Sequence, residues 1–313
     1  MLSIHTIQDH IKAPIVQNAR LSEFTTFRLG GRCPLLISCQ RLQEIQNVIQ
    51  YFYAQRMENY IVIGEGSNLL VSDDGIQEHV IRYFSKTAHF ERDGEEIIVE
   101  ACSRLDHLAF VCAKQGLAGL GFASGIPGSV GGAVVGNAGA FGHEMGEFTQ
   151  AVDVLDTKGR VRTLGRHNCA FSYRQSHFKD SKDIILSVRL KLKEGSAPTL
   201  LEERKKILLE RRAKHPNYHT VPCAGSFFKN IKASDPFDRR QAAGWFLDQI
   251  GAKQMLVGGA GVFEKHANIL IKKTPLCTAS DVYALSKKME QAVLEKFGIV
   301  LEREVRLLGS FTC

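Results

Sequence analysis

A glycine-dense stretch in the middle of the chain has the residue types needed to bind a small anionic molecule. Eleven of the 28 glycines lie between Gly116 and Gly146, and no lysine or arginine occurs from Gln115 through Gln150. Glycine permits positive φ and a close approach of the backbone to a ligand, so successive N–H groups can hold a phosphate without a cationic side chain. Interspersed apolar residues argue against a flexible surface loop. We therefore expect a ligand-binding loop, whose core is Gly125, Ile126, Pro127, Gly128, Ser129, Val130, Gly131 and Gly132.

A second candidate loop lies about 60 residues earlier and reads Gly64-Glu65-Gly66-Ser67-Asn68-Leu69. It is not the dinucleotide fingerprint of Rossmann folds, because leucine stands at the third glycine position and a strand is expected to follow. It is not a P-loop, because no Gly-Lys-Ser/Thr run occurs. Alone, such a loop is usually only a turn. Two such loops, each after a strand, suit the two phosphates of a dinucleotide.

The overall composition leaves several classes of partner open. With 44% hydrophobic and 23% charged residues, the 313-residue chain resembles an ordinary globular protein of two or three domains. Its net charge of +7 favours acidic partners, which include nucleic acid, anionic lipid and phosphorylated small molecules. The densest basic cluster, Arg204–Lys214, is explained at least as well by the solvated face of an amphipathic helix. Charge alone therefore does not identify the partner.

Neither metal-site nor disulfide patterns occur in the sequence. Its eight cysteines form no Cys-x-x-Cys pair, and Pro216 interrupts the helical spacing of His215 and His219. The N-terminal segment lacks a signal-peptide layout, and no apolar run approaches the ~18 residues of a membrane span. We expect a soluble cytoplasmic protein with reduced thiols, no metal and no membrane partner.

The chain divides into three regions that differ in their predicted secondary structure. Together they indicate an α+β fold. The predicted domains are residues 1–83, 84–195 and 196–313. In the first, a helix over Leu42–Arg56 precedes a buried strand over Tyr60–Ile63, which runs into the earlier glycine loop. Shorter strands are predicted at Leu69–Val71 and Val80–Tyr83.

The second region has the pattern of an antiparallel sheet. Turn residues at 92–94 and 158–159 separate extended runs, and Ser187–Lys193 alternates apolar and polar positions. A helix over Leu105–Gln115 and the glycine-dense stretch interrupt these strands.

The third region begins with the basic helix and contains a second long one. Ser280 is predicted to cap this second helix and Gly298 to end it, and a final strand is expected over Ile299–Leu308. The apolar stripe of the helix comprises Val282, Leu285, Met289, Val293 and Phe297.

The loops and further motifs resemble the UDP-N-acetylenolpyruvoylglucosamine reductase family. Motifs of that family occur in order from about residue 20 to 309, which is far more specific than either loop alone. They lie at residues 25–31, 62–70, 125–132, 137–140, 171–176, 224–230, 243–245 and 301–306.

The resemblance implies a PCMH-type FAD-binding fold, in which two N-terminal domains hold the flavin and a C-terminal α+β domain binds the substrate. It also implies a ping-pong cycle with NADPH as reductant. The substrate is the enolpyruvyl ether of UDP-N-acetylglucosamine, which takes the hydride at its methylene carbon and becomes UDP-N-acetylmuramate for the bacterial cell wall. The cofactor performs hydride transfer, while side chains position and polarise the substrate. Neither nucleic acid nor a membrane is an expected partner, and we expect a monomer.

Three catalytic assignments follow from the resemblance, each with a simpler alternative. Ser226 is implied to protonate the substrate carbon that becomes enolic after hydride addition, although it could merely cap a turn after Gly225. Arg174 is implied to bind the substrate carboxylate, although a surface ion pair is a common use of arginine. Glu304 is implied to assist as an acid or hydrogen-bond partner, but strand alternation alone does not distinguish it from Glu302.

The resemblance also assigns ligand contacts. Flavin contacts are implied for Gly64, Gly66, Ser67, Asn68, Leu69, Gly125, Ile126, Pro127, Gly128, Ser129, Gly131 and Gly132. Substrate contacts are hypothesised for Tyr173, Lys229, Asn230, His266 and Asn268.

The chain departs from the family pattern at three positions. Ile231 and Arg303 stand where proline is usual, and Gly136 replaces a larger apolar residue. These changes concern local backbone geometry. The short interval from Arg174 to Ser226 indicates the subclass that lacks an extra tyrosine-bearing loop.

Two other functions remain open at this stage. A different flavin oxidoreductase on the same fold would keep the glycine loops but would not need the three catalytic motifs together. A basic nucleic-acid-binding protein would show strongly salt-dependent binding to polynucleotides and no visible chromophore.

Overall fold

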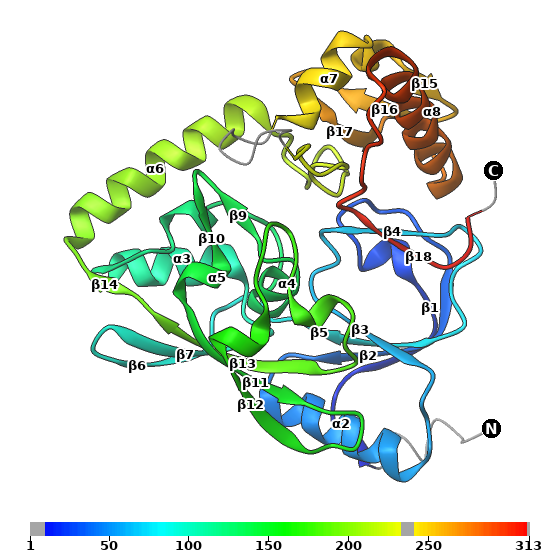
Figure 1. Cartoon of the computed structure of the whole chain (residues 1–313). Coiled ribbons are helices and arrows are strands. Elements are labelled where there is room, and N and C mark those ends of the chain that lie inside the picture. Colours follow the sequence, from blue (N-terminus) through cyan, green and yellow to red (C-terminus); the bar gives the residue numbers. More distant parts are fainter. Residues whose placement is uncertain (1–9, 233–240, 312–313) are drawn as a thin grey trace. The chain divides into compact units, whose positions relative to one another are not determined.

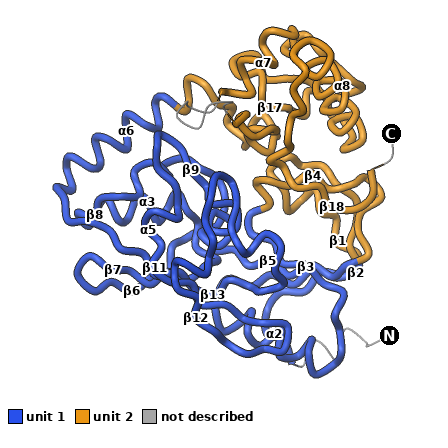
Figure 2. The backbone as a smooth tube through the Cα atoms, in the orientation of Figure 1, with its two compact units in different colours: residues 1–17, 34–65, 78–210 blue, residues 18–33, 66–77, 211–313 orange. Residues whose placement is uncertain are grey.

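The computed structural model describes residues 10–232 and 241–311. The chain forms two compact units, each assembled from separate stretches of sequence (Figure 2). Unit 1 contains residues 1–17, 34–65 and 78–210, and unit 2 contains residues 18–33, 66–77 and 211–313. The division into three consecutive domains stays a prediction.

The first sheet has the strand order β1-β2-β5-β3 and belongs to unit 1 except for residues 18–20 of β1 and 32–33 of β2. β5 pairs in parallel with both β2 and β3. Strands β2 and β3 lie on either side of β5, and helix α2 connects them as a crossover, which parallel strands require. The elements are β1 (Ile15–Arg20), β2 (Arg32–Cys39), α2 (Leu42–Ala54), β3 (Tyr60–Ile63) and β5 (His79–Tyr83). The predicted helix and strands of this region are therefore confirmed, with ends that differ by one or two residues.

The second sheet of unit 1 is antiparallel and has the order β12-β11-β13-β7-β6 (Figure 1). Its strands are β6 (Phe90–Asp93), β7 (Glu96–Glu100), β11 (Thr149–Leu155), β12 (Val161–Gly165) and β13 (Ile184–Lys191). The two predicted hairpins are confirmed, because a two-residue glycine-containing turn lies between β6 and β7 and a longer one between β11 and β12.

Helices and short strands connected to this sheet complete unit 1. Helix α3 and helix α4 contribute buried side chains to one hydrophobic core that also contains residues from both sheets. The remaining elements are α3 (Leu105–Lys114), β8 (Leu117–Ala118), α4 (Val130–Val135), β9 (Gly139–Ala140), β10 (His143–Glu144), α5 (Met145–Phe148) and β14 (Lys193–Glu194). The short 3-10 helices of unit 1 are η2 (Gly121–Ala123), η3 (Arg166–Cys169) and η4 (His177–Lys179), while η1 (Leu21–Glu23) and η5 (Ala252–Gln254) lie in unit 2.

Unit 2 has its own hydrophobic core around an antiparallel sheet, β15-β16-β17, and two helices. Helix α6 (Ala197–Lys214) begins in unit 1 and ends in unit 2. The short strand β4, from the N-terminal part of the chain, pairs in parallel with β18 near the C-terminus. The elements are β4 (Leu69–Val71), α7 (Ala243–Gln249), β15 (Leu256–Val257), β16 (Ala260–Phe263), β17 (His266–Lys272), α8 (Ala279–Phe297) and β18 (Arg306–Leu308).

Helix α8 follows the predicted stripe but begins at a different cap. Val282, Leu285, Met289 and Val293 are fully buried, and Gly298 ends the helix with φ of 68°. Thr278, not Ser280, is the N-cap. A capping box explains the difference: Thr278 Oγ1 accepts from the Asp281 N–H, and the Asp281 carboxylate accepts from the Thr278 N–H, both at 3.0 Å. The final strand is also shorter than predicted, since only β18 is regular.

Candidate active site

The loop 125–132 is held in unit 1 by backbone pairing to the segment before helix α3. The Leu105 N–H donates to the Gly128 carbonyl at 3.0 Å, and the Val130 N–H donates to the Ser103 carbonyl at 2.8 Å. Gly125 and Gly128 have φ of +74° and +127°. These are conformations that side chains with a Cβ rarely adopt, so glycine is needed at both positions.

Two N–H groups of this loop donate to carboxylates. The Gly125 N–H donates to Asp106 Oδ1 and the Gly128 N–H donates to Glu65 Oε2, each at 2.6 Å. These bonds occupy both N–H groups with the chain's own carboxylates, so they fix the loop. The glycines at 125, 128, 131 and 132 leave the loop backbone without Cβ atoms, which fits a close approach of the anionic part of FAD. Asp106 was not predicted from the sequence, because a first-turn acidic residue of a helix carries no signal of a distant partner.

The two glycine loops meet in unit 1 at Gly64. A Cβ added to Gly64 would lie 2.4 Å from Ser129 Oγ. Glycine at this position therefore lets the two segments of the chain approach this closely. Ser129 Oγ in turn accepts from the Gly132 N–H at 3.2 Å as the N-cap of α4. The structure thus brings together Gly64 and the later loop, as expected for two loops that serve one ligand.

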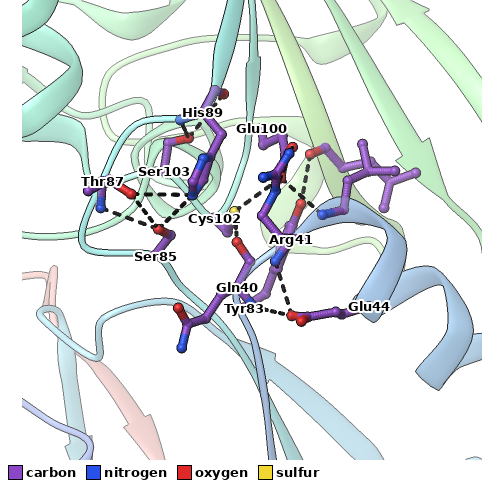
Figure 3. Close-up of polar contacts among 12 residues, drawn as sticks. Gln40, Arg41, Glu44, Tyr83, Ser85, Thr87, His89, Glu100, Cys102 and Ser103 are labelled. Carbon is purple, nitrogen blue, oxygen red and sulfur yellow. Dashed lines mark hydrogen bonds and ion pairs between the residues drawn. The ribbon is translucent and has the colours of Figure 1, made fainter. Parts of the chain in front are cut away.

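A polar network behind the loop fixes the segment that pairs with it (Figure 3). Glu100 accepts from Arg41 Nη2 at 2.9 Å and from the Leu42 N–H at 3.0 Å. The buried Cys102 thiol donates to the Gln40 carbonyl at 3.2 Å, and burial raises the pKa of this thiol to about 12. Because the neighbouring residues carry the carbonyls that the loop binds, this network positions the loop. The sequence gives no sign of it, since its members lie far apart in the chain.

The rest of the earlier loop lies in unit 2, beside the C-terminal motif. Asn68 Nδ2 donates to the Glu304 carbonyl at 3.0 Å, and the Arg306 N–H donates to the Asn68 carbonyl at 3.0 Å. Leu69 begins β4 and pairs with Arg306. Gly66 has φ of +76°, and a Cβ there would lie 2.3 Å from the Phe24 carbonyl oxygen. Residues 66–69 are therefore fixed against the segment that carries Glu304.

Ser226 lies in a segment of unit 2 whose backbone is hydrogen-bonded to the side chain of Asn268. Asn268 is 2% exposed. Its Oδ1 accepts from the Phe228 N–H at 2.9 Å, and its Nδ2 donates to the Phe228 carbonyl at 2.8 Å. On the other side, the Glu304 N–H donates to the Phe227 carbonyl at 2.8 Å. Ser226 and Glu304 are thus attached to one clamped segment, and Asn268 is its clamp.

The other candidates in unit 2 are engaged as follows. The Lys229 ammonium forms an ion pair with Glu302. Asn230 Oδ1 accepts from the Ala243 N–H at 3.2 Å. The His266 ring lies 5.3 Å from the His215 ring between centroids, and burial lowers the pKa of His266. These contacts place Lys229, Asn230 and His266 in the same unit as Ser226.

Arg174 lies at the tip of a tight turn in unit 1. The turn is closed by reciprocal backbone hydrogen bonds between Ser172 and Gln175 at 3.1 and 3.0 Å. Arg174 has φ of 54°, its Nη2 donates to the Gly139 carbonyl at 2.9 Å, and its guanidinium carbon lies 5.3 Å from the Tyr173 ring centroid. Positive φ in a non-glycine residue is strained and is concentrated at functional sites.

Asn137 ties this turn to the glycine-dense stretch. It is fully buried, its Nδ2 donates to the Ser172 carbonyl at 2.9 Å, and its Oδ1 accepts from the Gly146 N–H at 2.8 Å. Arg174 is therefore positioned by the same part of unit 1 that carries the 125–132 loop.

The three departures from the family pattern fit their surroundings. Gly136 has an ordinary helical φ of −86° at the end of α4. The Ile231 N–H donates to the Gln241 carbonyl at 2.9 Å, a bond that proline has no N–H to make. Arg303 Nε donates to Glu290 at 2.8 Å.

Within 10–232 and 241–311, no group of three or more His, Cys, Asp or Glu side chains is arranged to hold a metal ion. None of the helices in those ranges combines the length and hydropathy of a bilayer-spanning segment.

Comparison with known proteins defines the class first. An FAD-binding domain profile matches residues 34–165, and the loops within that range have the geometry described above. The chain is an FAD-dependent oxidoreductase with a PCMH-type α+β fold. A second profile, for the C-terminal domain of UDP-N-acetylenolpyruvoylglucosamine reductase, matches residues 215–308.

Whole-chain relatives then define the family. The reductase of Chloroherpeton thalassium is 35% identical over 312 residues, which cover 99% of this chain and 98% of the relative. That of Caldicellulosiruptor bescii is 36% identical, covering 93% and 90%. The crystal structure of the Thermus caldophilus reductase superposes with a TM-score of 0.75 at 30% identity, covering 95% of this chain and 99% of the other. The chain belongs to the UDP-N-acetylenolpyruvoylglucosamine reductase family.

Proposed function

We propose that this protein reduces the enolpyruvyl ether of UDP-N-acetylglucosamine to UDP-N-acetylmuramate in peptidoglycan precursor synthesis, with electrons from NADPH passing through FAD. The observation that carries the proposal is the match to reductases of this family over 99% of the chain. FAD, when bound, supplies the hydride transfer. Residues of the two glycine loops, Gly64–Leu69 and Gly125–Gly132, hold it.

Ser226 is the proton donor to the substrate carbon next to the carboxylate. A serine hydroxyl is a weak acid, so it must be held in hydrogen-bond range of that carbon's developing electron pair. Support comes from the fixed backbone on its C-terminal side, where Phe227 and Phe228 bond to Asn268 and Glu304. The sequence suggested Asn268 as a substrate contact; because both of its amide atoms bond to Phe228, we propose instead that it positions Ser226.

Arg174 binds the substrate carboxylate and stabilises the negative charge that develops there. A guanidinium presents a planar pair of donors that matches a carboxylate. The closed turn and the bond to Gly139 restrict the side chain before substrate arrives, which reduces the entropy lost on binding. Tyr173, which lies against the guanidinium, helps to keep that orientation.

Glu304 acts as an acid or a hydrogen-bond partner for the enol-like form of the substrate. Its backbone donates to Phe227 and its carbonyl accepts from Asn68, so the residue is restrained from both sides. Lys229, Asn230 and His266 contribute to binding the nucleotide-sugar in unit 2. We further propose a cytoplasmic monomer with no nucleic-acid or membrane partner.

An anaerobic absorption experiment tests the proposal. The flavin band of the purified holoenzyme should bleach on addition of NADPH and return on addition of the enolpyruvyl UDP-sugar. A band that bleaches but does not return would mean that the substrate is a different small molecule. Protein that neither contains FAD nor takes it up would contradict the proposal entirely.

A further inference from the structure

Unit 1 contains a cavity outside the residues assigned to flavin and substrate. It has a volume of about 230 Å³ and lies between helix α3, the segment 117–124, the β9–β10 hairpin and helix α6. Ligand sites for drug-sized molecules are about 300–1,000 Å³, so this cavity suits a fragment of roughly ten non-hydrogen atoms. Its walls are mostly apolar and include Leu117, Phe122, Phe141, Leu200 and Ile207.

Two polar residues of the lining have incomplete hydrogen bonding. Ser124 is fully buried, and its Oγ has no hydrogen-bond partner among the described residues. Arg204 Nη1 is likewise buried without a partner in that part of the chain. Leaving such groups unsatisfied in an apolar site is unfavourable. Both therefore have hydrogen bonds to offer to a bound molecule.

The charges around the cavity favour a neutral bound molecule over an anionic one. The Arg204 charge is already offset, because Nη2 donates to Asp106 at 2.7 Å. Glu203, an exposed residue of the lining, adds a further negative charge. An anion would meet two carboxylates for one cation. A neutral acceptor, such as an amide carbonyl, would take the Arg204 hydrogen bond without this repulsion.

The hairpin beside the cavity has a strained aromatic residue at its turn, and this residue is 46% exposed. Phe141 and Gly142 form its two-residue turn, with φ of 52° and 82°. Glycine, asparagine and aspartate are preferred at such positions, and a bulky residue is an outlier. Strained residues of this kind occur at ligand clamps. Phe141 lines the cavity, so an aromatic ligand would find a ring partner in it.

We propose that this cavity is a second binding site, which takes a small neutral molecule with an aromatic body and a carboxamide or similar carbonyl group. The carbonyl accepts from Arg204, and Ser124 completes the polar end. The site is not part of the flavin loop, but it is joined to it, since the Asp106 oxygen that binds Arg204 also accepts from the Gly125 N–H.

Benzamide titrated into the FAD-loaded enzyme tests the proposal by calorimetry and ligand-observed NMR. We expect saturable one-to-one binding in the range of roughly 0.1–1 mM. Benzoate and toluene, which match its ring, should each bind at least about tenfold more weakly, because one adds a charge and the other lacks an acceptor. Equal affinity for benzoate and benzamide, or no saturation below about 10 mM, would overturn the proposal.

Variants locate the binding. Arg204→Met should weaken benzamide binding about tenfold, and Ser124→Ala about threefold or more. Ala113→Leu, from the lining contributed by α3, should abolish binding by filling the cavity, while retained FAD absorbance shows that the protein is folded. The matched control, Lys206→Gln on the exposed face of α6, should bind normally. Binding that survives Ala113→Leu, or that releases FAD from the unmodified enzyme, would contradict a separate site here.

Discussion

Replacing Asn268 with alanine should release the segment that carries Ser226. The amide of Asn268 satisfies both backbone groups of Phe228, at 2.9 and 2.8 Å, and the residue is 2% exposed. Each buried backbone group left without a partner costs about 1–3 kcal/mol. Local relaxation recovers part of that cost, so we expect the free energy of unfolding of unit 2 to fall by about 2–4 kcal/mol.

Urea unfolding followed by tryptophan fluorescence measures the decrease in the unfolding free energy of unit 2. Trp245 is the only tryptophan of the chain, and it lies in α7 of unit 2. Gln291→Ala is the matched control, because Gln291 is an exposed amide on α8 of the same unit, bonded to Glu295 at 2.8 Å. Its unfolding free energy should change by less than about 0.5 kcal/mol.

Kinetics distinguish a clamp from a merely stabilising residue. In Asn268→Ala under stabilising conditions, reduction of the flavin by NADPH should stay close to that of the unmodified enzyme, while reoxidation by the UDP-sugar slows. Asn268 is not a clamp on this segment if Asn268→Ala is as stable as Gln291→Ala, or if its folded form reoxidises at the normal rate.

Further predictions concern the cofactor loop, pH and the thiols. Gly64→Ala should lower FAD content at purification, because its Cβ would meet Ser129 Oγ at 2.4 Å, and adding Ser129→Ala should restore part of it. Burial, with His266 and two cations nearby, lowers the pKa of His215 to about 4. The unfolded chain binds the proton from about pH 6.5 downward. Unit 2 should therefore lose stability in urea melts as pH falls from about 6.5 to 4, and His215→Gln should flatten that slope. Burial also raises the pKa of Cys112 to about 12. The seven described cysteines are all buried and should react with a thiol reagent at pH 8 only after denaturation.

Local patterns predicted much of the fold because their causes are local. The helix α2, the hairpins of the second sheet and the buried stripe of α8 follow from hydrophobic periodicity and turn residues close together in sequence. The glycine loops were found for the same reason, since positive φ and close approach demand glycine whatever lies across the contact. Thr278 rather than Ser280 caps α8, because its partner Asp281 stands at the third helical position.

Contacts between residues that are distant in the sequence could not be predicted from such local patterns. Nothing local marks Asp106 and Glu65 as acceptors for loop N–H groups, or Asn268 as a buried clamp, because each role depends on a partner distant in the chain. The pairing of β4 with β18 likewise joins segments from opposite ends of the sequence. It places residues 66–77 in unit 2, which no boundary signal in the sequence indicates.

The central claim is that Ser226 donates a proton to substrate after the flavin has been reduced. Stopped-flow absorbance on Ser226→Ala tests it by separating the two half-reactions. In this variant NADPH should reduce the flavin at nearly the normal rate, while the enolpyruvyl UDP-sugar reoxidises it about 10²–10⁴-fold more slowly. Equal slowing of both half-reactions would mean that Ser226 shapes the site, and normal reoxidation would mean that another group supplies the proton.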